Sequence, residues 1–388
     1  MHWKARLVKI KRAFFMGNYY SMSELFKDIY NQAFYQQFAD VVNNVIEGFS
    51  TDSFINKIFD ESFDGMELKA RMAHTSSVLH YFLDDDFDVA TKQIIAIIDA
   101  LESKGLSEKS IEYMFFPHYI EQFGLDEYES AIVAFERITQ FTSCEFAVRP
   151  FLVKYPESML TQMTDWSKHS HASVRRLASE GARPRLPWAM GLPAYKENPA
   201  PLLPILMALR NDEDEIVRRS VANNLNDIAK DNPDFVVNFA QQHGGESVNT
   251  DKLIKHACRT LLKQGHPAIL SFYGLSCEHL SVDNLVVECD ALHIGESLAF
   301  EFDVTNHDVK SRKVRLEYAI HYRKKNGQLA PKVFKISERD YGASSTMHIQ
   351  RKQSFKVITT RVFHVGGHRL SIIVNGQTFV NHDFELLT

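Results

Sequence analysis

Cysteine is scarce in this sequence, which argues against a disulfide-stapled fold. Among 388 residues there are four cysteines, Cys144, Cys258, Cys277 and Cys289, and no two are closely spaced. This pattern favours free thiols in a reducing cytoplasm over a disulfide framework or a zinc site. The 17 histidines are scattered along the chain. We therefore expect a cytoplasmic protein with no metal site and no cofactor.

Long apolar runs are also missing, and so is a strong charge of either sign. No run approaches the roughly 20 residues that span a bilayer, so we expect no membrane segment. The first 22 residues are basic and partly amphipathic, but they lack the apolar core and cleavage site of a secretory signal. We treat 1–22 as an extension of unknown role, a start-site extension or expression remnant rather than a functional arm. The net charge of −5 excludes a general basic coat but allows a local basic surface.

Two kinds of periodicity divide the chain near residue 282. Up to that point apolar residues recur every three or four positions, which is typical of helices. Beyond it they alternate, as in SLAFEFDVTN (297–306) and VRLEYAIHYR (314–323), and turn sequences such as KKNGQ, HVGGH and VNGQ separate the runs. The alternation predicts an immunoglobulin-like antiparallel β-sandwich over 282–388.

The helical part, 23–281, contains a repeat with a period near 40 residues. Three segments share one frame and are each preceded by a second helix that starts at or near a proline: HASVRRLASEGA (171–182), EIVRRSVANNLNDIA (215–229) and KLIKHACRTLLKQ (252–264). An earlier pair, SAIVAFERITQF and CEFAVRPFLVKY, fits the same scheme. Paired helices at this period predict HEAT-like repeats stacked into a solenoid whose second helices line one concave wall.

The polar faces of these second helices are the candidate functional surface. Arg176, Glu180 and Arg183 share one face of the first helix. On the second, we expect Val217, Val221, Leu225 and Ile228 to pack inward and to leave Ser220, Asn223, Asn224 and Asp227 on the opposite side. On the third, Lys255, Arg259 and Lys263 are spaced one turn apart and form a basic stripe suited to a phosphate chain.

Each of these features also has a purely structural interpretation. The basic stripe could be solvated, Arg176 and Glu180 could form an ordinary surface pair, and Arg175 and Arg218 could bridge neighbouring repeats. Trp188 could belong to the core, and Asp227 could be a solvated residue near a helix end. Taken singly, none of these residues decides between the two interpretations.

The combination of motifs resembles the AlkC family of bacterial DNA alkylation-repair glycosylases, relatives of AlkD. The resemblance depends on SCEFAVRPF, VRRLASEGARPRLPWA and DEIVRRSVANNLNDIAKDNPDFV, of which the RLASEGARPRLPW string is the most specific. It extends from SELFKDIYNQAF at residue 23 through GMELKARMAH and YMFFPHYIEQFGLDEYESA to the end of the solenoid. Some members carry a C-terminal immunoglobulin-like domain, as we expect here.

The resemblance implies an activity and a set of site residues. The family removes N3-methyladenine and, in the AlkC branch, N3-methylcytosine from DNA by cutting the base–sugar bond, and it bends the duplex instead of flipping the base into a closed pocket. The implied partner is damaged double-stranded DNA, bound by a monomer. The catalytic positions carried over are Asp227, Glu180, Glu145 and Trp188, and the expected DNA-binding positions are Arg183, Arg176, Lys255, Arg259 and Lys263.

The chemistry of a cationic lesion suits these residue types. An N3-methylated base already carries positive charge, so it leaves without a strong acid, while the deoxyribose becomes cationic. We expect Asp227 to stabilise that sugar and position water, Glu180 and Glu145 to complete an acidic cluster, and Trp188 to stack near the lesion. No lysine stands out as a Schiff-base nucleophile, so we expect a monofunctional glycosylase without strand-nicking activity.

Two further expectations concern partners. From residue 283 onward there are 15 Lys and Arg against 12 Asp and Glu, a balance of +3 that leaves −8 for the rest of the chain. This bias suggests that the β-domain contacts the duplex, through HYRKKNG or HDVKSRKVR if these are not simply solvated turns. The alternative function is a non-catalytic HEAT-repeat module that binds DNA or protein.

Overall fold

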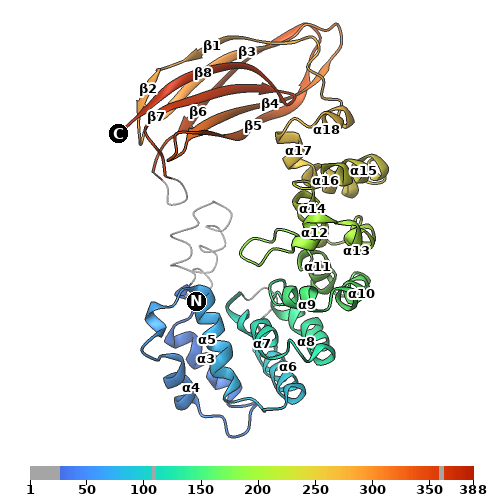
Figure 1. The fold of residues 1–388 in the computed structure, drawn as a ribbon, viewed down its shortest axis with the longest axis vertical. Helices are drawn as coiled ribbons and strands as arrows, with labels where there is room; N and C mark the ends of the chain where they lie inside the picture. The colour runs from blue at the N-terminus through green and yellow to red at the C-terminus, as the bar shows by residue number, and fades with distance from the viewer. Residues whose placement is uncertain (1–26, 107–110, 358–361) are drawn as a thin grey trace. The chain divides into compact units, whose positions relative to one another are not determined.

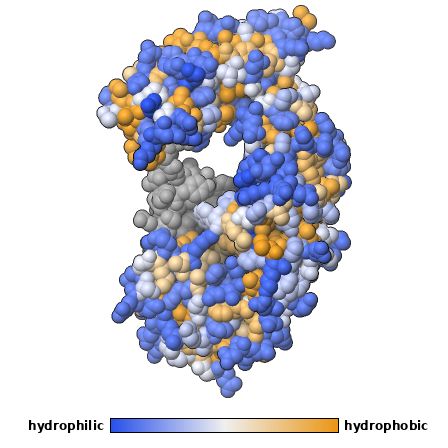
Figure 2. All heavy atoms as spheres, in the orientation of Figure 1, coloured by the Kyte–Doolittle hydropathy of each residue, from blue (hydrophilic) through white to orange (hydrophobic). Residues whose placement is uncertain are grey.

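The computed structural model describes residues 27–106, 111–357 and 362–388, and these residues divide into two compact units on either side of the boundary between Ala257 and Cys258. The predicted N-terminal extension, 1–22, lies outside the described residues. Within the described ranges, no helix is long and apolar enough to cross a membrane. Hydrophilic and hydrophobic side chains are interspersed over the face drawn in Figure 2.

The first unit is helical, as the three- and four-residue periodicity predicts. Its first half contains short 3-10 turns at Phe63–Gly65 and Ile111–Tyr113 and the helices α3 (Gln32–Val42), α4 (Thr51–Ile58), α5 (Leu68–His80), α6 (Phe87–Ser103), α7 (Phe115–Phe123), α8 (Tyr128–Phe141) and α9 (Val148–Lys154). Aromatic side chains fill the core of this half, with Tyr35, Phe38, Phe54 and Phe115 fully buried. These large rings contribute much of the apolar area that holds the short helices together.

The second half of this unit carries the repeats (Figure 1). Its elements are α10 (Pro156–Trp166), α11 (Ala172–Glu180), α12 (Pro193–Glu197), a 3-10 turn (Ala200–Leu202), α13 (Leu203–Leu209), α14 (Glu215–Ile228), α15 (Pro233–His243) and α16 (Val248–Ala257). Proline is the first residue of α10 and α15 and the second of α13, where a missing N–H costs nothing. Helix α11 packs against α14, and α14 packs against α16. The predicted stack of second helices is therefore confirmed.

Side-chain caps and ion pairs define the repeat boundaries. The Asp214 carboxylate accepts a hydrogen bond from the backbone N–H of Ile216 at the start of α14. Arg175 of α11 reaches the next repeat, where its Nε lies 2.7 Å from an Asp212 oxygen. Arg218 instead donates to the carbonyl of Asp212 just before its own helix. The bridging interpretation is thus confirmed for Arg175, whereas Arg218 braces the start of α14.

The second unit contains two short helices followed by a β-sandwich. The helices are α17 (Arg259–Lys263) and α18 (Pro267–Phe272); the strands are β1 (Leu280–Val287), β2 (Ala291–His293), β3 (Ser297–Asn306), β4 (Arg312–Arg323), β5 (Leu329–Tyr341), β6 (Ser345–Ser354), β7 (Gly366–Val374) and β8 (Gln377–Leu387). One sheet has the order β1-β3-β6 and the other β2-β8-β7-β4-β5. All pairs are antiparallel except β2 with β8, which run parallel.

The alternation seen in the sequence determines which side chains fill the sandwich. Leu298, Phe300, Phe302 and Val304 of β3 are buried, as the period of two requires. The VNGQ turn joins β7 to β8 through Asn375 and Gly376, both at positive φ, the conformation of the tightest hairpin turns. The fold class predicted from the sequence is therefore confirmed.

The domain boundary after residue 281 stays a prediction. Strand β1 begins at Leu280, but the compact unit that contains the sandwich begins at Cys258. The segment 258–279, which precedes β1, contacts the β7–β8 turn of the sandwich. A Cβ on Gly265 would lie 2.6 Å from the Gly376 carbonyl oxygen, and Asn375 Nδ2 donates to the Ser276 carbonyl at 2.6 Å. The two short helices α17 and α18 thus pack with the β-domain.

One buried histidine, His368, and one partly buried histidine, His321, predict a pH dependence for the β-domain. Burial lowers the pKa of His368 and of His321, so the folded state binds protons less readily than the unfolded state. We expect the full free energy of unfolding above about pH 6.5, the pKa of a histidine in the unfolded chain. It should decrease as the pH falls from there through the lower pKa values that the two histidines have in the folded state. Thermal unfolding of the full chain at pH 7.5 and 5.5 measures this effect. His368→Phe should show a smaller decrease, and an equal decrease would contradict the assignment.

Candidate functional site

The end of α11 carries a carboxylate that the helix alone would not stabilise. Glu180 is the last residue of α11, where the helix dipole disfavours negative charge. Two arginines offset it: Arg183 Nη1 lies 2.6 Å from Glu180 Oε1, and Arg176 Nη2 lies 3.8 Å from the same oxygen. The surface-pair interpretation of Arg176 and Glu180 is wrong, because only 7% of the Glu180 side chain is exposed.

Packing of α14 against α11 brings Asp227 to the same place. Arg183 Nε lies 2.9 Å from Asp227 Oδ2, and Lys230 Nζ lies 3.0 Å from Asp227 Oδ1. The Asp227 side chain is 3% exposed, so the interpretation of Asp227 as a solvated residue is wrong. Arg183 therefore bridges two carboxylates from neighbouring repeats inside the protein.

Glu145, just before α9, is connected through Arg176. Arg176 Nη2 lies 2.7 Å from Glu145 Oε2, and Ser143 Oγ donates to that oxygen at 2.7 Å. Burial by itself would raise the pKa of the Glu145 carboxyl, but the Arg176 charge and these hydrogen bonds hold it below its ordinary value. Glu145 is accordingly a carboxylate at neutral pH.

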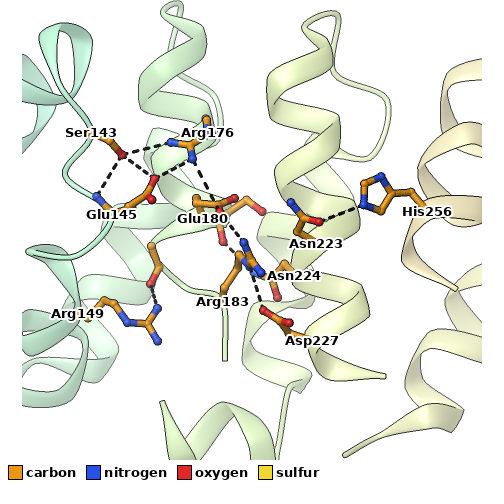
Figure 3. A network of polar contacts seen from close by, with 12 residues as sticks. Ser143, Glu145, Arg149, Arg176, Glu180, Arg183, Asn223, Asn224, Asp227 and His256 are labelled. Atoms are coloured by element: carbon orange, nitrogen blue, oxygen red, sulfur yellow. Dashed lines mark hydrogen bonds and ion pairs between the residues drawn. The ribbon is translucent and has the colours of Figure 1, made fainter. Parts of the chain in front are cut away.

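The five side chains form one chain of alternating charge, which we call the acid–arginine network: Glu145, Arg176, Glu180, Arg183 and Asp227 (Figure 3). The three acids that the sequence singled out thus belong to one connected cluster. Arg183 and Arg176, for which we expected phosphate contacts, instead use guanidinium nitrogens on these acids. Their contacts with DNA, and the catalytic role of the acids, stay predictions.

The polar side of α14 is less exposed than the sequence suggests. Val217, Val221, Leu225 and Ile228 are buried as predicted. Ser220 and Asn224 on the other side are buried as well, and Asn224 Nδ2 donates to the Ser179 carbonyl at 2.9 Å. His256 of α16 contacts Asn223 Oδ1 at 3.1 Å. Polar contacts between repeats, rather than solvent, therefore occupy this face.

Trp188 lies in the segment 181–192 between α11 and α12. Its side chain is half-exposed, with 47% of the residue accessible, so the interpretation of Trp188 as a core residue is wrong. Its φ of 66° is a left-handed conformation that residues with a side chain rarely adopt. Its carbonyl accepts a hydrogen bond from Lys69 Nζ of α5. A role in stacking near the lesion stays a prediction.

The basic stripe does not lie on one continuous helix. Helix α16 ends at Ala257, Cys258 is not helical, and α17 begins at Arg259. Lys255 is therefore in the first compact unit, whereas Arg259 and Lys263 are in the second. The prediction that the three residues lie one turn apart on a single helix is therefore wrong, because the helix is interrupted at Cys258. Their contact with DNA stays a prediction.

Three residues of the site were missed from the sequence. Ser143 and Lys230 flank predicted acids at two- and three-residue spacing, which was an available signal. Arg149 gave no such signal: it is fully buried on α9, and it donates to the carbonyls of Gly181 at 2.7 Å and Met190 at 2.8 Å. Its importance is visible only from tertiary contacts.

A cavity of about 160 Å³ lies beside the Glu145 end of the network. Ser143 lines it and also donates to Glu145, while Phe146, Met72 and Met190 provide apolar walls.

Among the described residues, no group of His, Cys, Asp and Glu is arranged to hold a metal ion.

Comparison with known proteins places these features in a family. A family model described as "DNA alkylation repair enzyme" matches 90–261, and one described as the C-terminal Ig-like domain of uncharacterised protein YhaZ matches 281–388. The chain is 40% identical over 361 residues to uncharacterized protein YhaZ of Bacillus subtilis, covering 93% of this chain and 99% of that one.

A solved structure extends the match to the whole architecture. It is the Pseudomonas fluorescens alkylpurine DNA glycosylase AlkC bound to DNA containing an abasic site analog. The TM-score is 0.88 at 32% identity, with coverage of 94% of this chain and 99% of that one. Together with the two family models and the YhaZ relative, this similarity shows that the chain belongs to the AlkC family of DNA alkylation-repair proteins, among the members with a C-terminal immunoglobulin-like domain.

Proposed function

We propose that this protein is a monofunctional DNA glycosylase that hydrolyses the N-glycosidic bond of cationic alkylated bases, N3-methyladenine and N3-methylcytosine, in duplex DNA. The observation that carries the proposal is the acid–arginine network, which holds three carboxylates from three successive parts of the solenoid in one cluster. Its relation to an AlkC glycosylase solved with DNA supports the same activity. We further propose that it acts in the bacterial cytoplasm as a monomer, on nucleoid DNA and without a cofactor.

The proposed reaction requires no proton for the leaving group. The base departs with the electron pair of its bond to C1′, and the positive charge of the lesion passes to the deoxyribose. Water then adds to C1′ and releases one proton. Anionic groups fixed before the reaction stabilise this cation without reorganising, which is the most effective kind of electrostatic catalysis.

Asp227 is the residue best suited to this role. Each of its oxygens accepts one hydrogen bond, from Lys230 and from Arg183, whereas a carboxylate offers about four lone-pair sites. It can therefore accept a further hydrogen bond from the attacking water while its position stays fixed. Glu180, held by the same Arg183, adds negative charge nearby.

The substrate range follows from the same chemistry. A neutral lesion with a strong glycosidic bond needs a general acid, and the proposed site supplies carboxylates and arginines instead. We expect release of N3-methylated bases and little release of uracil, which is neutral. The proposal also holds that the lesion is reached in a bent duplex, without a closed pocket for a flipped base.

The experiment is base release from duplex DNA treated with a methylating agent, with the freed bases separated and identified. We expect N3-methyladenine among the products and abasic sites that remain unnicked until alkali is added. Strand breaks without alkali would contradict a monofunctional enzyme. Tight binding of the methylated duplex with no base released would favour the alternative, a non-catalytic DNA-binding module.

A further inference from the structure

Arg149 of α9 is a fully buried arginine that contacts both ends of the segment 181–192. Its Nη1 donates to the Gly181 carbonyl at 2.7 Å, and its Nε donates to the Met190 carbonyl at 2.8 Å. Figure 3 shows its guanidinium below Glu145 and to the left of Arg183. One planar side chain thus fixes the separation between two points of the backbone.

The first point is the end of α11. Gly181 follows Glu180 directly and precedes Arg183 by two residues. A Cβ at Gly181 would lie 2.6 Å from Val148 Cγ2, so only glycine lets α11 end this close to α9. Because Arg149 follows Val148, this approach puts the Gly181 carbonyl within its reach. The turn that bears Glu180 is therefore anchored to α9.

The second point is the segment that carries Trp188. Met190 is two residues beyond Trp188, whose left-handed backbone is strained and persists only when surrounding contacts impose it. Those contacts come from Arg149 on the Met190 carbonyl and from Lys69 on the Trp188 carbonyl. Contacts from α5 and α9 therefore hold this conformation together with two backbone hydrogen bonds inside the segment, from Ala189 to the Leu186 carbonyl and from Leu192 to the Pro184 carbonyl.

Stability alone does not account for a charge at this position. Burial, with the nearby positive charge of Arg183, lowers the pKa of Arg149 to about 10. Its Nη2 is buried and has no hydrogen-bond partner among the described residues. Burying a charge costs free energy that hydrogen bonds and opposite charges must offset. An apolar side chain, however, cannot hold two carbonyls at a fixed distance.

We propose that Arg149 is a positioning residue that sets Trp188 relative to Glu180 for base excision. The inference rests on the proposed function in one respect, because the groups that Arg149 positions are the proposed catalytic ones. It assigns no contact with DNA to Arg149 itself.

The test is Arg149→Met, measured by excision rate and by Trp188 fluorescence. With enzyme in excess over methylated duplex, we expect the single-turnover rate to fall by roughly tenfold or more. The Kd for the same duplex should change by less than about twofold, because no DNA contact is removed. Acrylamide quenching of Trp188, taken as the difference from the matching Trp188→Phe protein, should change in the unbound enzyme.

Two further variants separate positioning from general destabilisation. Arg149→Lys keeps the charge but has one amine in place of the two-pronged guanidinium, so it should recover only part of the rate and of the quenching. Arg175→Met removes another buried arginine, one that donates to the His169 and Ser170 carbonyls. It should unfold more readily while keeping the wild-type Trp188 quenching and excision rate.

The outcomes are distinguishable. A folded Arg149→Met protein with the wild-type excision rate and wild-type Trp188 quenching would overturn the proposal. An Arg175→Met protein with slower excision and altered Trp188 quenching would overturn it as well. If Arg149→Met does not fold, the Arg149→Lys protein decides by the same two measurements. If the wild type releases no base, the proposed function fails, while the fluorescence comparison still tests whether Arg149 positions Trp188.

Discussion

Replacing Asp227 with asparagine is expected to slow base excision by about 100-fold or more, while the protein stays folded at lower stability and keeps most of its DNA affinity. A unit charge about 4 Å from a developing cation contributes roughly 4 kcal/mol at an effective dielectric constant of 20. Loss of about 2.7 kcal/mol of this stabilisation corresponds to about 100-fold in rate. The measurement is single-turnover release of N3-methyladenine, together with thermal unfolding of each protein.

Asp212→Asn is the matched control for this variant. Asp212 also pairs with an arginine across a repeat boundary, at 2.7 Å from Arg175, and is also mostly buried. It lies outside the acid–arginine network, so its loss should cost stability without slowing excision. An Asp227→Asn protein that excises bases at the wild-type rate would remove Asp227 from the mechanism. Equal slowing in both variants would mean that the effect comes from the fold.

Removing Arg183 should have the largest effect on stability. Its side chain is 8% exposed and lies between Glu180 and Asp227, which are 7% and 3% exposed. Arg183→Met leaves two carboxylates buried without their shared cation, and breaking such a pair costs about 3–5 kcal/mol. We expect a loss of this size in the free energy of unfolding, measured by urea titration at pH 7.5.

Arg185→Met provides the comparison for that experiment. Arg185 is two residues away and pairs with Asp231 at 2.6 Å, but its side chain is 38% exposed. Exposed pairs typically contribute less than about 1 kcal/mol, so this variant should be nearly as stable as the wild type. If the Arg183→Met protein were equally stable, Arg183 would not be the cation that holds the network together.

Much of the helical and β architecture could be predicted because periodicity records which side of an element is buried. The spaced apolar positions Val217, Val221, Leu225 and Ile228 are buried as predicted, and so are the alternating positions Leu298, Phe300, Phe302 and Val304. The break at Cys258 could not be predicted in this way. Ile254, Cys258, Leu261 and Leu262 are all buried, so the apolar pattern continues through the point where one helix ends and the next begins.

Some residues of the candidate site could likewise be predicted from the sequence, and others could not. Family motifs picked out Glu145, Glu180 and Asp227, and the structure connects all three. The motifs did not predict that Arg183 would be buried between two of them, because arginine is usually exposed and its partner Asp227 is 44 residues away in the chain. The same holds for Arg149, whose acceptors are backbone carbonyls that no sequence pattern marks.

The sequence alone determined the order of helical repeats and β-sandwich, the family resemblance, and the identity of the acidic residues, because composition and spacing are local properties of the chain. Only the tertiary structure decided which charges are paired and buried. Packing of α11 against α14 and of the α11 end against α9 brings together groups that are distant in sequence. The free energy of a buried charge depends on these neighbours.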